Sequence, residues 1–394
     1  MKILLINKYY YLKGGSEKYL FELENLLKAN GHQVHIFSMK DEKNLQSSDE
    51  QFFVSQADFK KNNLFKNLKE LKNVFYRRQA VTNLKKLITQ YRPDIVHLNN
   101  INFQLTTSII DYLKKEKIPM VMTLHDYQLI CPNHLLYTKG KYCQRCLNKN
   151  FFQCLKYKCY DNSFSRSFIA AGESYFNHWR RVYDKIDLFI SPSNFLKEKM
   201  VQFGFKEERI KVLPNFLNLT KYQDKVVSLK EDFYLYVGRL EKQKGIKELV
   251  DFFNQRTETL KIIGTGELEQ DLKSRAKSNI IFYGNLPNDQ AMKILASAKA
   301  LIVPSLWPEN CPYVVLEAMV LKTPVIATAS GGLPELVPND FLFDNYDELA
   351  DILSQLKTNK FTSEKLTKNV GDFSKNFSQE KYYQHLISLY KSLV

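Results

Sequence analysis

The chain has 394 residues, which corresponds to two or three domains of roughly 150 residues each. It is 44% hydrophobic and has only 14 glycines and 12 prolines, which excludes a disordered, collagen-like or disulfide-stapled protein. The 57 basic and 42 acidic residues leave a net charge of +15, which favours an anionic partner: nucleic acid, an acidic membrane surface or a phosphorylated substrate.

The amino-terminal stretch is apolar only briefly. Residues 1–7 contain about five apolar positions, too few for a secretory signal, and no apolar run approaches the roughly 20 residues that cross a bilayer. We therefore expect a cytoplasmic protein, with its six cysteines reduced unless something binds them.

In the first half of the chain, short apolar segments alternate with helical patterns. The segments are continuous and rich in β-branched residues, as is typical of strands buried on both faces of a parallel sheet. A helix is predicted over residues 16–30, ending before Gly31. The predicted strands are residues 3–6, 34–37, 95–98, 120–123 and 188–190.

The second half repeats this alternation after residue 215. Strands alternating with helices predict right-handed βαβ units, so we predict an α/β protein of two doubly wound, Rossmann-like domains, residues 1–214 and 215–375. Ligands of such sheets bind beyond the carboxyl ends of the strands, so two facing domains would form one cleft. The predicted strands are 233–237, 260–263, 280–283, 300–303 and 325–327, with helices over 248–254, 268–277 and 289–297.

Two glycine-containing loops follow predicted strands. Gly14-Gly15 opens the first helix, where free N–H groups and a partial positive charge suit a diphosphate, although a plain tight turn explains it equally well. In the second half, Gly238-Arg239 ends a strand and Lys244 follows on the same loop. Two cations there are placed to neutralise a diphosphate, although a solvated basic loop is common for any single lysine.

The segment 304–319 carries two glutamates, Glu309 in a predicted loop and Glu317 in the helix that follows. Alone, they would be typical of a charge at a helix start and of a surface residue. Their surroundings indicate more: Ala-Met follows Glu317, and residues 323–327 then return as a Pro-Val-Ile-Ala strand.

This arrangement resembles the signature of family 4 glycosyltransferases. The resemblance spans nearly the whole chain, because further motifs of that family occur in the same order: Gly14-Gly15, Thr123-Leu124-His125-Asp126, Ser191-Pro192-Ser193, Gly238-Arg239 and Lys244-Gly245. It implies the GT-B fold, two Rossmann-like domains facing across a cleft, with a carboxyl-terminal helix over residues 376–394 that crosses back to the first domain.

The resemblance also implies a reaction and four catalytic residues. The chain would be a retaining glycosyltransferase that moves a hexose-type sugar from a UDP- or GDP-sugar to a glycan or lipid-linked acceptor in bacterial surface polysaccharide synthesis (capsule, O-antigen or exopolysaccharide). Arg239 and Lys244 would bind the diphosphate and stabilise its departing charge. Glu309 would contact sugar hydroxyls, and His125 would lie at the reacting face.

Further residues are expected to bind the donor. Glu317 would contact the ribose, Leu286 would lie near the base, and backbone near Gly15 would meet the phosphates or the acceptor. The chain departs from the family at residues 310–312, where small, glycine-containing residues are usual and where Pro312 offers no N–H. The predicted donor-binding set is Gly14, Gly15, Gly238, Leu286, Asn310, Cys311 and Glu317. No catalytic metal is expected, because no Asp-x-Asp pair stands in a suitable loop.

Cysteines cluster in a predicted insertion, residues 131–165. A Cys-x2-Cys pair and two later cysteines fit four thiolates around a structural zinc ion, which would have no open position and no catalytic role. Reduced thiols, a redox-dependent disulfide and an iron–sulfur cluster are the alternatives. The predicted ligands are Cys143, Cys146, Cys154 and Cys159.

Between Lys60 and Arg92 the chain has ten basic residues and one acidic residue, Glu70, with apolar residues near helical spacing. This pattern predicts a helix with a solvated basic face, or one that docks on anionic lipid and brings the enzyme to a lipid-linked acceptor at the inner face of the membrane. Arg77 and Arg78 belong to the expected basic face.

Two other classes of function compete with the transferase. One is another two-domain sugar-nucleotide enzyme, an epimerase or an inverting transferase, against which the paired glutamates and the two loop cations argue. The other is a nucleic-acid-binding protein, but no nucleic-acid-binding motif or aromatic stacking platform supports it. We therefore expect no nucleic acid partner.

Overall fold

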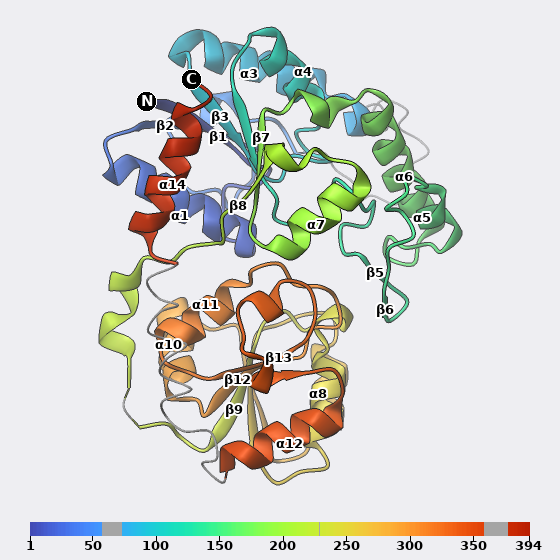
Figure 1. The fold of residues 1–394 in the computed structure, drawn as a ribbon, viewed down its shortest axis with the longest axis vertical. Helices are drawn as coiled ribbons and strands as arrows, with labels where there is room; N and C mark the ends of the chain where they lie inside the picture. The colour runs from blue at the N-terminus through green and yellow to red at the C-terminus, as the bar shows by residue number, and fades with distance from the viewer. Residues whose placement is uncertain (57–72, 228, 358–376) are drawn as a thin grey trace. The chain divides into compact units, whose positions relative to one another are not determined.

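The computed structural model describes residues 1–56, 73–227, 229–357 and 377–394 (Figure 1). Contacts between residues divide the chain into two units. The first unit contains residues Met1–Leu135, Gln144–Leu213 and Tyr382–Val394. The second contains Leu136–Cys143 and Pro214–Lys381.

The first unit is built on a six-stranded parallel sheet with the order β2-β1-β3-β4-β7-β8. Its central strands are buried along nearly their whole length, which explains their continuous apolar sequences. The strands are β1 (Lys2–Ile6), β2 (Gln33–Phe37), β3 (Ile95–Leu98), β4 (Met120–Thr123), β7 (Leu188–Ser191) and β8 (Ile210–Val212).

Helices connect these strands. Ser193 caps α7 by accepting a hydrogen bond from the Leu196 N–H at 3.2 Å, and the helix ends at Gly204 in the left-handed conformation. The helices of this part of the chain are α1 (Gly15–Ala29), α3 (Arg78–Tyr91), α4 (Ser108–Lys115), α5 (Phe152–Lys156), α6 (Phe164–Trp179), α7 (Asn194–Phe203) and α14 (Gln379–Lys391).

The second unit has its own six-stranded parallel sheet, ordered β11-β10-β9-β12-β13-β14, and a separate hairpin of β5 and β6. Its strands are β5 (Tyr137–Thr138), β6 (Lys141–Tyr142), β9 (Phe233–Val237), β10 (Thr259–Ile263), β11 (Ile280–Gly284), β12 (Ala300–Val303), β13 (Val325–Thr328) and β14 (Leu342–Phe343). Its helices are α8 (Ile246–Phe253), α9 (Glu269–Arg275), α10 (Asn288–Ser297), α11 (Tyr313–Val320) and α12 (Tyr346–Lys357).

The predicted fold class is confirmed: both units are parallel, doubly wound α/β structures, and all ten predicted strands are present. The expected return of the carboxyl-terminal helix is also observed. Tyr382 and Tyr390 of α14 are buried in the first unit, where the Tyr382 hydroxyl lies 2.5 Å from that of Tyr19. In Figure 1, α14 lies beside α1.

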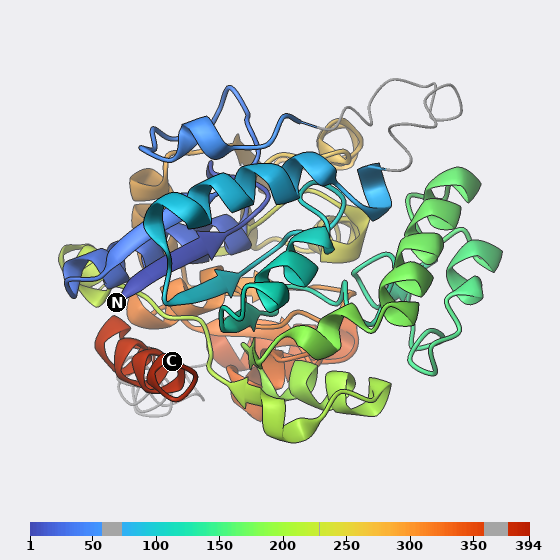
Figure 2. The same ribbon diagram turned by 90° about the horizontal axis from the view of Figure 1, so that it is seen from above.

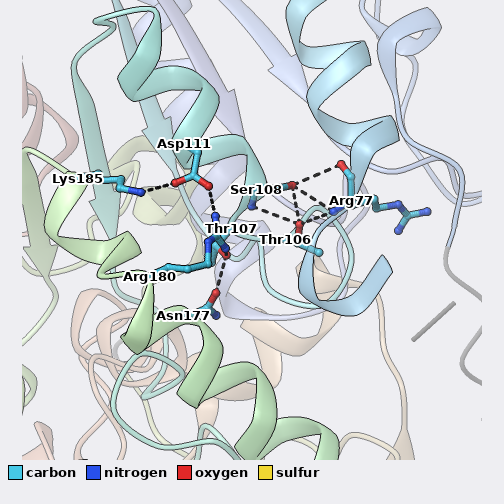
Figure 3. A network of polar contacts seen from close by, with 8 residues as sticks. All are labelled: Arg77, Thr106, Thr107, Ser108, Asp111, Asn177, Arg180 and Lys185. Carbon is cyan, nitrogen blue, oxygen red and sulfur yellow. Dashed lines mark hydrogen bonds and ion pairs between the residues drawn. The ribbon is translucent and has the colours of Figure 1, made fainter. Parts of the chain in front are cut away.

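The expected basic helix differs from the prediction. Residues 57–72 lie outside the described part of the chain, and α3 begins only at Arg78. Arg77 is not a surface cation, because it is 4% exposed and its guanidinium donates to the carbonyl oxygens of Gln104 and Ser55. Its place in the predicted lipid-facing set is therefore wrong; Figure 3 draws it beside Thr106 and Ser108.

Within the described residues, none of the helices combines the length and the apolar character needed to pass through a bilayer.

Candidate active site

The carboxyl ends of the parallel strands meet at one edge of the second sheet, and the predicted donor-side residues follow these ends. Gly238 and Arg239 come directly after β9, Leu286 lies just beyond β11, and Glu309 lies beyond β12. Parallel strands direct their carboxyl ends to the same edge, which is where doubly wound sheets bind ligands. The second unit thus gathers residues that are up to 71 positions apart in sequence (309 minus 238) along one edge.

Lys244 and Glu309 form a largely buried ion pair at this edge. Lys244 Nζ lies 2.7 Å from Glu309 Oε1, and the two side chains are 18% and 9% exposed. Ser305 Oγ and Trp307 Nε1 donate to the same oxygen at 2.8 and 2.9 Å. Within the described residues, no hydrogen bond reaches the other oxygen, Glu309 Oε2, which leaves it able to accept from a ligand hydroxyl.

Two opposing effects act on the Glu309 carboxyl group. Burial alone would raise its pKa, because it penalises the charged form. The charge of Lys244, together with the hydrogen bonds from Lys244, Ser305 and Trp307, outweighs burial and holds the pKa below its usual value. Glu309 is therefore a carboxylate at neutral pH, as acceptance of sugar hydroxyls requires.

The backbone of Glu309 is held by the loop after β13. The Gly332 N–H donates to the Glu309 carbonyl at 2.6 Å. Gly331 has a φ of +67°, and a Cβ at this position would lie 2.2 Å from the Glu309 carbonyl oxygen. Only glycine permits both this conformation and this close approach. The Gly331-Gly332 backbone therefore fixes the position of the loop that carries Glu309.

The cations differ in their surroundings. Lys244 lies in a short 3-10 turn, Lys242–Lys244, which Gly245 ends with a φ of +67°. A Cβ on Gly245 would lie 1.8 Å from the Pro304 carbonyl oxygen, so glycine brings this turn close to the end of β12. Arg239 instead keeps 61% of its side chain exposed and forms an ion pair with Glu241 at 2.7 Å.

The remaining donor-side residues occupy distinct places in the second unit. Asn310 and Cys311 are buried just before α11, and the Cys311 carbonyl accepts a hydrogen bond from Asn215 at 2.7 Å. Burial raises the pKa of the Cys311 thiol to about 12, so the thiol is neutral at physiological pH. Glu317 is buried in α11 and accepts from the Tyr222 hydroxyl at 3.2 Å, while Leu286 is half-buried.

In the first unit, His125 follows β4 and joins a buried polar cluster. Its Nε2 lies 2.8 Å from Asn99 Oδ1, and its ring packs edge-on against Tyr19 with the ring centres 4.9 Å apart. Burial lowers the pKa of His125 to about 4, so the imidazole is neutral at pH 7. Because Asn99 Oδ1 only accepts, the ring proton resides on Nε2.

The glycine loop of the first unit opens α1 as predicted. Gly15 is the first helical residue and Gly14 precedes it in an extended conformation, and both are exposed. Their exposed backbone offers N–H groups at a helix terminus. Glu17 in the first turn is buried and accepts hydrogen bonds from Ser16 Oγ at 2.9 Å and Asn7 Nδ2 at 3.3 Å.

Sequence reasoning missed the side chains that orient the predicted residues. Ser305 and Trp307 hold Glu309, and Asn99 holds His125. Their positions in the sequence could have indicated these residues. Ser305 and Trp307 lie within the signature segment 304–319, and Asn99 follows the carboxyl end of β3. Which polar groups meet depends on side-chain conformations that a residue pattern does not specify.

Cys154 lies among other cysteines of the first unit. It is buried and forms a side-chain hydrogen bond with Cys159, and this bond and burial raise the pKa of its thiol, with smaller contributions from Cys131 and Cys146. Cys143 belongs to the second unit. In the part of the chain that the structure describes, no group of three or more histidine, cysteine or acidic side chains is arranged to hold a metal. The zinc site stays a prediction, which metal analysis of the purified protein tests.

Two family models match the chain. The model described as Glycosyltransferase Family 4 matches residues 13–221, and the model described as Glycosyl transferases group 1 matches residues 220–376. The first covers more than half of the chain, and the second begins where it ends.

Individual proteins are similar over most or all of their lengths. A 42.6 kDa protein in the cps region of Klebsiella pneumoniae is 25% identical over 380 residues, which are 89% of this chain and 92% of that protein. An uncharacterised glycosyltransferase of Methanocaldococcus jannaschii is 26% identical over 416 aligned positions, covering 100% of this chain and 99% of its own. The solved structure of Anabaena Alr3699/HepE in complex with UDP-glucose matches with a TM-score of 0.66 at 17% identity, covering 100% of both chains.

Proposed function

The chain belongs to glycosyltransferase family 4, and from this premise we propose that it transfers a hexosyl residue, with retention of anomeric configuration, from a UDP- or GDP-sugar. The acceptor is a glycan or lipid-linked saccharide in the assembly of a bacterial surface polysaccharide. The observation that carries the proposal is the Lys244–Glu309 pair, with Oε2 of Glu309 left for a ligand.

The two cations act on the departing group. In the reaction, the bond between the anomeric carbon and the diphosphate oxygen breaks, the acceptor oxygen bonds to that carbon, and the acceptor proton passes to the departing phosphate or to solvent. Negative charge grows on the diphosphate as its bond to sugar breaks. Lys244, fixed by its pair, offsets this charge without needing to be reorganised during the reaction. Arg239, which is exposed on the loop after β9, adds a second cation.

The acidic and imidazole groups have separate roles. Glu309, ionised and held at Oε1 by three donors, accepts hydrogen bonds from sugar hydroxyls through Oε2. His125, neutral at pH 7, adds no charge at the end of β4, where the family's motif assigns the reacting face. These roles follow the family's motif order in this chain.

The relatives support the choice of donor and acceptor classes. Alr3699/HepE was solved with UDP-glucose, which favours a uridine-diphosphate hexose among the donors. The Klebsiella relative lies in a cps region, which favours a surface polysaccharide as the destination of the sugar.

The test is transfer from a panel of UDP- and GDP-hexoses, with the anomeric configuration of the product determined by NMR. We expect Arg239→Ala and Lys244→Ala to lower the transfer rate by about 100-fold or more, because each removes a cation that stabilises the departing charge. Lys242→Ala is the matched control, since Lys242 is an exposed lysine on the same turn, and its rate should stay within about twofold of wild type.

Two results would contradict the proposal. If Arg239→Ala and Lys244→Ala transferred sugar as fast as the control Lys242→Ala, Arg239 and Lys244 would have no role in binding the diphosphate. An inverted product, or an epimerised donor without transfer, would favour the inverting transferase or the epimerase instead.

A further inference from the structure

Helix α6 has one buried and one exposed side. The buried side consists of small and polar residues, namely Ser167, Ala170, Ala171, Glu173 and Asn177. The exposed side carries four large aromatic residues spaced four, seven and four positions apart, which places them in one line along the helix. This aromatic ridge consists of Phe164 (60% exposed), Phe168 (59%), Tyr175 (43%) and Trp179 (80%).

The ridge is extended sideways by α5. Phe152 of α5 is 56% exposed, and its backbone N–H donates to the Tyr175 hydroxyl at 3.1 Å, so a fifth aromatic ring lies beside the ridge. The ridge runs about 22 Å, from the rise of 1.5 Å per residue over 15 residues. Figures 1 and 2 both place α5 and α6 at the outer margin of the first unit, opposite α14.

Polar contacts attach the inner side of α6 to the rest of the first unit. Asn177 accepts a hydrogen bond from Thr107 at 2.6 Å, and Arg180, just after α6, forms an ion pair with Asp111 of α4 (Figure 3). Lys185 donates to the same aspartate at 2.5 Å. Polar contacts therefore hold the helix by its inner side. Of the ridge residues, Tyr175 also packs on the buried Phe151, with ring centres 5.0 Å apart. Several large aromatic side chains exposed in one line are typical of an interaction site.

The surroundings of the ridge are strongly basic. Residues 144–181 contain seven basic residues and two acidic ones. Of the acidic residues, Glu173 is buried, and Asp161 is paired with Arg166 at 2.5 Å. A cavity of about 530 Å³ borders the carboxyl-terminal part of α6, and its charged lining is mostly basic: Lys149, Arg181, Lys206 and Arg209, with Asp184, which pairs with Arg181 at 2.7 Å. Arg180 and Arg181 pair with Asp111 and Asp184, so Arg145, Lys149, Lys156 and Lys158 carry the excess positive charge. This excess favours a partner that is anionic as well as apolar.

We propose that the aromatic ridge and its basic flanks form a docking surface for an anionic lipid bilayer. The rings enter the boundary between headgroups and acyl chains, where aromatic side chains are favourable, and the cations contact lipid phosphates. Charge argues against a second copy of this chain, because two ridges placed face to face would bring their basic flanks together. The proposal does not rest on the donor chemistry, which lies in the other unit.

Flotation with liposomes tests the proposal on the full chain. We expect binding to vesicles of phosphatidylcholine and phosphatidylglycerol, weaker binding to phosphatidylcholine alone, and weakening by salt. The double variant Phe168→Ser/Trp179→Ser should lower the partition coefficient about tenfold or more. The matched control, Leu45→Ser/Ile281→Ser, removes two exposed apolar side chains elsewhere and should bind as wild type does.

A second measurement leaves the ridge intact. The chain has two tryptophans, Trp179 on the ridge and Trp307 beside Glu309. In a Trp307→Phe variant, Trp179 is the single tryptophan, so its emission should shift to shorter wavelength on addition of the anionic vesicles and should be quenched by brominated lipid.

Several outcomes would overturn the proposal. Wild-type binding by the ridge variant, or an unshifted Trp179 emission, would do so directly. Binding lost in Lys85→Glu/Lys86→Glu but kept in the ridge variant would move the docking surface to α3. A dimer that the ridge variant converts to a monomer, without vesicle binding, would make the ridge a self-association surface. Vesicle binding without sugar transfer would leave this proposal standing while the proposed function failed.

Discussion

Glu173 is a buried acid in the first unit whose ionisation opposes folding. Its Oε1 accepts hydrogen bonds from Asn102 and Asn177 at 2.8 and 2.7 Å, but burial dominates and raises the pKa of Glu173 to about 7. The folded state therefore holds this proton more tightly than the unfolded chain does. The resulting stability is fully present below the unfolded pKa near 4.5 and is lost as pH rises through about 7, a change of roughly 3 kcal/mol.

Glu173→Gln should remove this pH dependence, because the amide oxygen still accepts from both asparagines and cannot ionise. Relative to the variant, wild type should lose about 2.5 kcal/mol of unfolding free energy between pH 5 and pH 8, since part of the change already occurs below pH 5. Urea unfolding at both pH values measures the difference, and other titrating groups cancel in the comparison. An unchanged difference would mean that the carboxyl group titrates as in the unfolded chain.

At the scale of elements, α14 is tied to the first sheet by a buried tyrosine. The Tyr390 hydroxyl bonds to Nδ1 of His97, whose Nε2 lies 2.7 Å from Thr123 Oγ1, and both Tyr390 and His97 are fully buried. Tyr390→Phe should destabilise the protein by about 1–3 kcal/mol, because it leaves a buried ring nitrogen without its partner.

The same helix provides the control for this prediction. The Tyr383 hydroxyl also pairs with a histidine, His32, at 2.8 Å, but both residues are partly exposed and water can replace the bond. Tyr383→Phe should therefore cost less than about 1 kcal/mol in thermal or urea unfolding. Equal losses in the two variants would show that burial of the pair is not what matters.

The loop after β13 makes a second prediction at this scale. Gly331→Ala should displace the Glu309 loop and lower transfer about tenfold or more, because the new Cβ would overlap the Glu309 carbonyl. Gly31→Ala is the control: its φ is +78°, so it carries the same backbone strain, but nothing lies within 4 Å of its Cβ. Its transfer rate should stay within about twofold of wild type, and equal rate losses would assign the effect to strain alone.

At the scale of the whole molecule, the first unit is discontinuous in sequence, because residues Tyr382–Val394 complete it. A fragment of residues 1–213 should therefore fail to fold stably, since Tyr382, Leu386 and Tyr390 are missing from its core. Circular dichroism and binding of a hydrophobic dye would measure this. Joining residues 377–394 to the fragment through a flexible linker should restore folding, and a stable fragment without them would contradict the prediction.

The strands could be predicted where both faces are buried, because such strands have a continuous run of apolar residues in the sequence, as in β3 and β12. Among the described residues, four strands were missed: the edge strands β8 and β14, and both strands of the β5–β6 hairpin. Lys211 stands at the centre of β8, and β5, β6 and β14 have two residues each, so pairing with a neighbour defines them. The assignment of Arg77 failed because a count of charges does not tell a buried guanidinium from a solvated one.

The motif order identified Lys244 and Glu309, but the pairing between them depends on how two loops pack at the end of β12, which no spacing encodes. The neutral state of His125 likewise follows from burial beside Tyr19, a contact made across 106 positions of sequence (125 minus 19). Sequence thus identified these residues, while their charge states and partners required the three-dimensional arrangement.

The placement of α14 also determines the order in which the two units can complete their cores during translation. Residues Tyr382–Val394 are translated after Pro214–Lys381, the main segment of the second unit. The first unit, although its translation starts earlier, can therefore close its core only after that segment is complete. A prematurely terminated polypeptide keeps Tyr19 and His97 uncovered on the side that α14 would occupy. Synthesis through α14 is therefore a condition for a closed first unit, and products that end before α14 stay open to proteolysis.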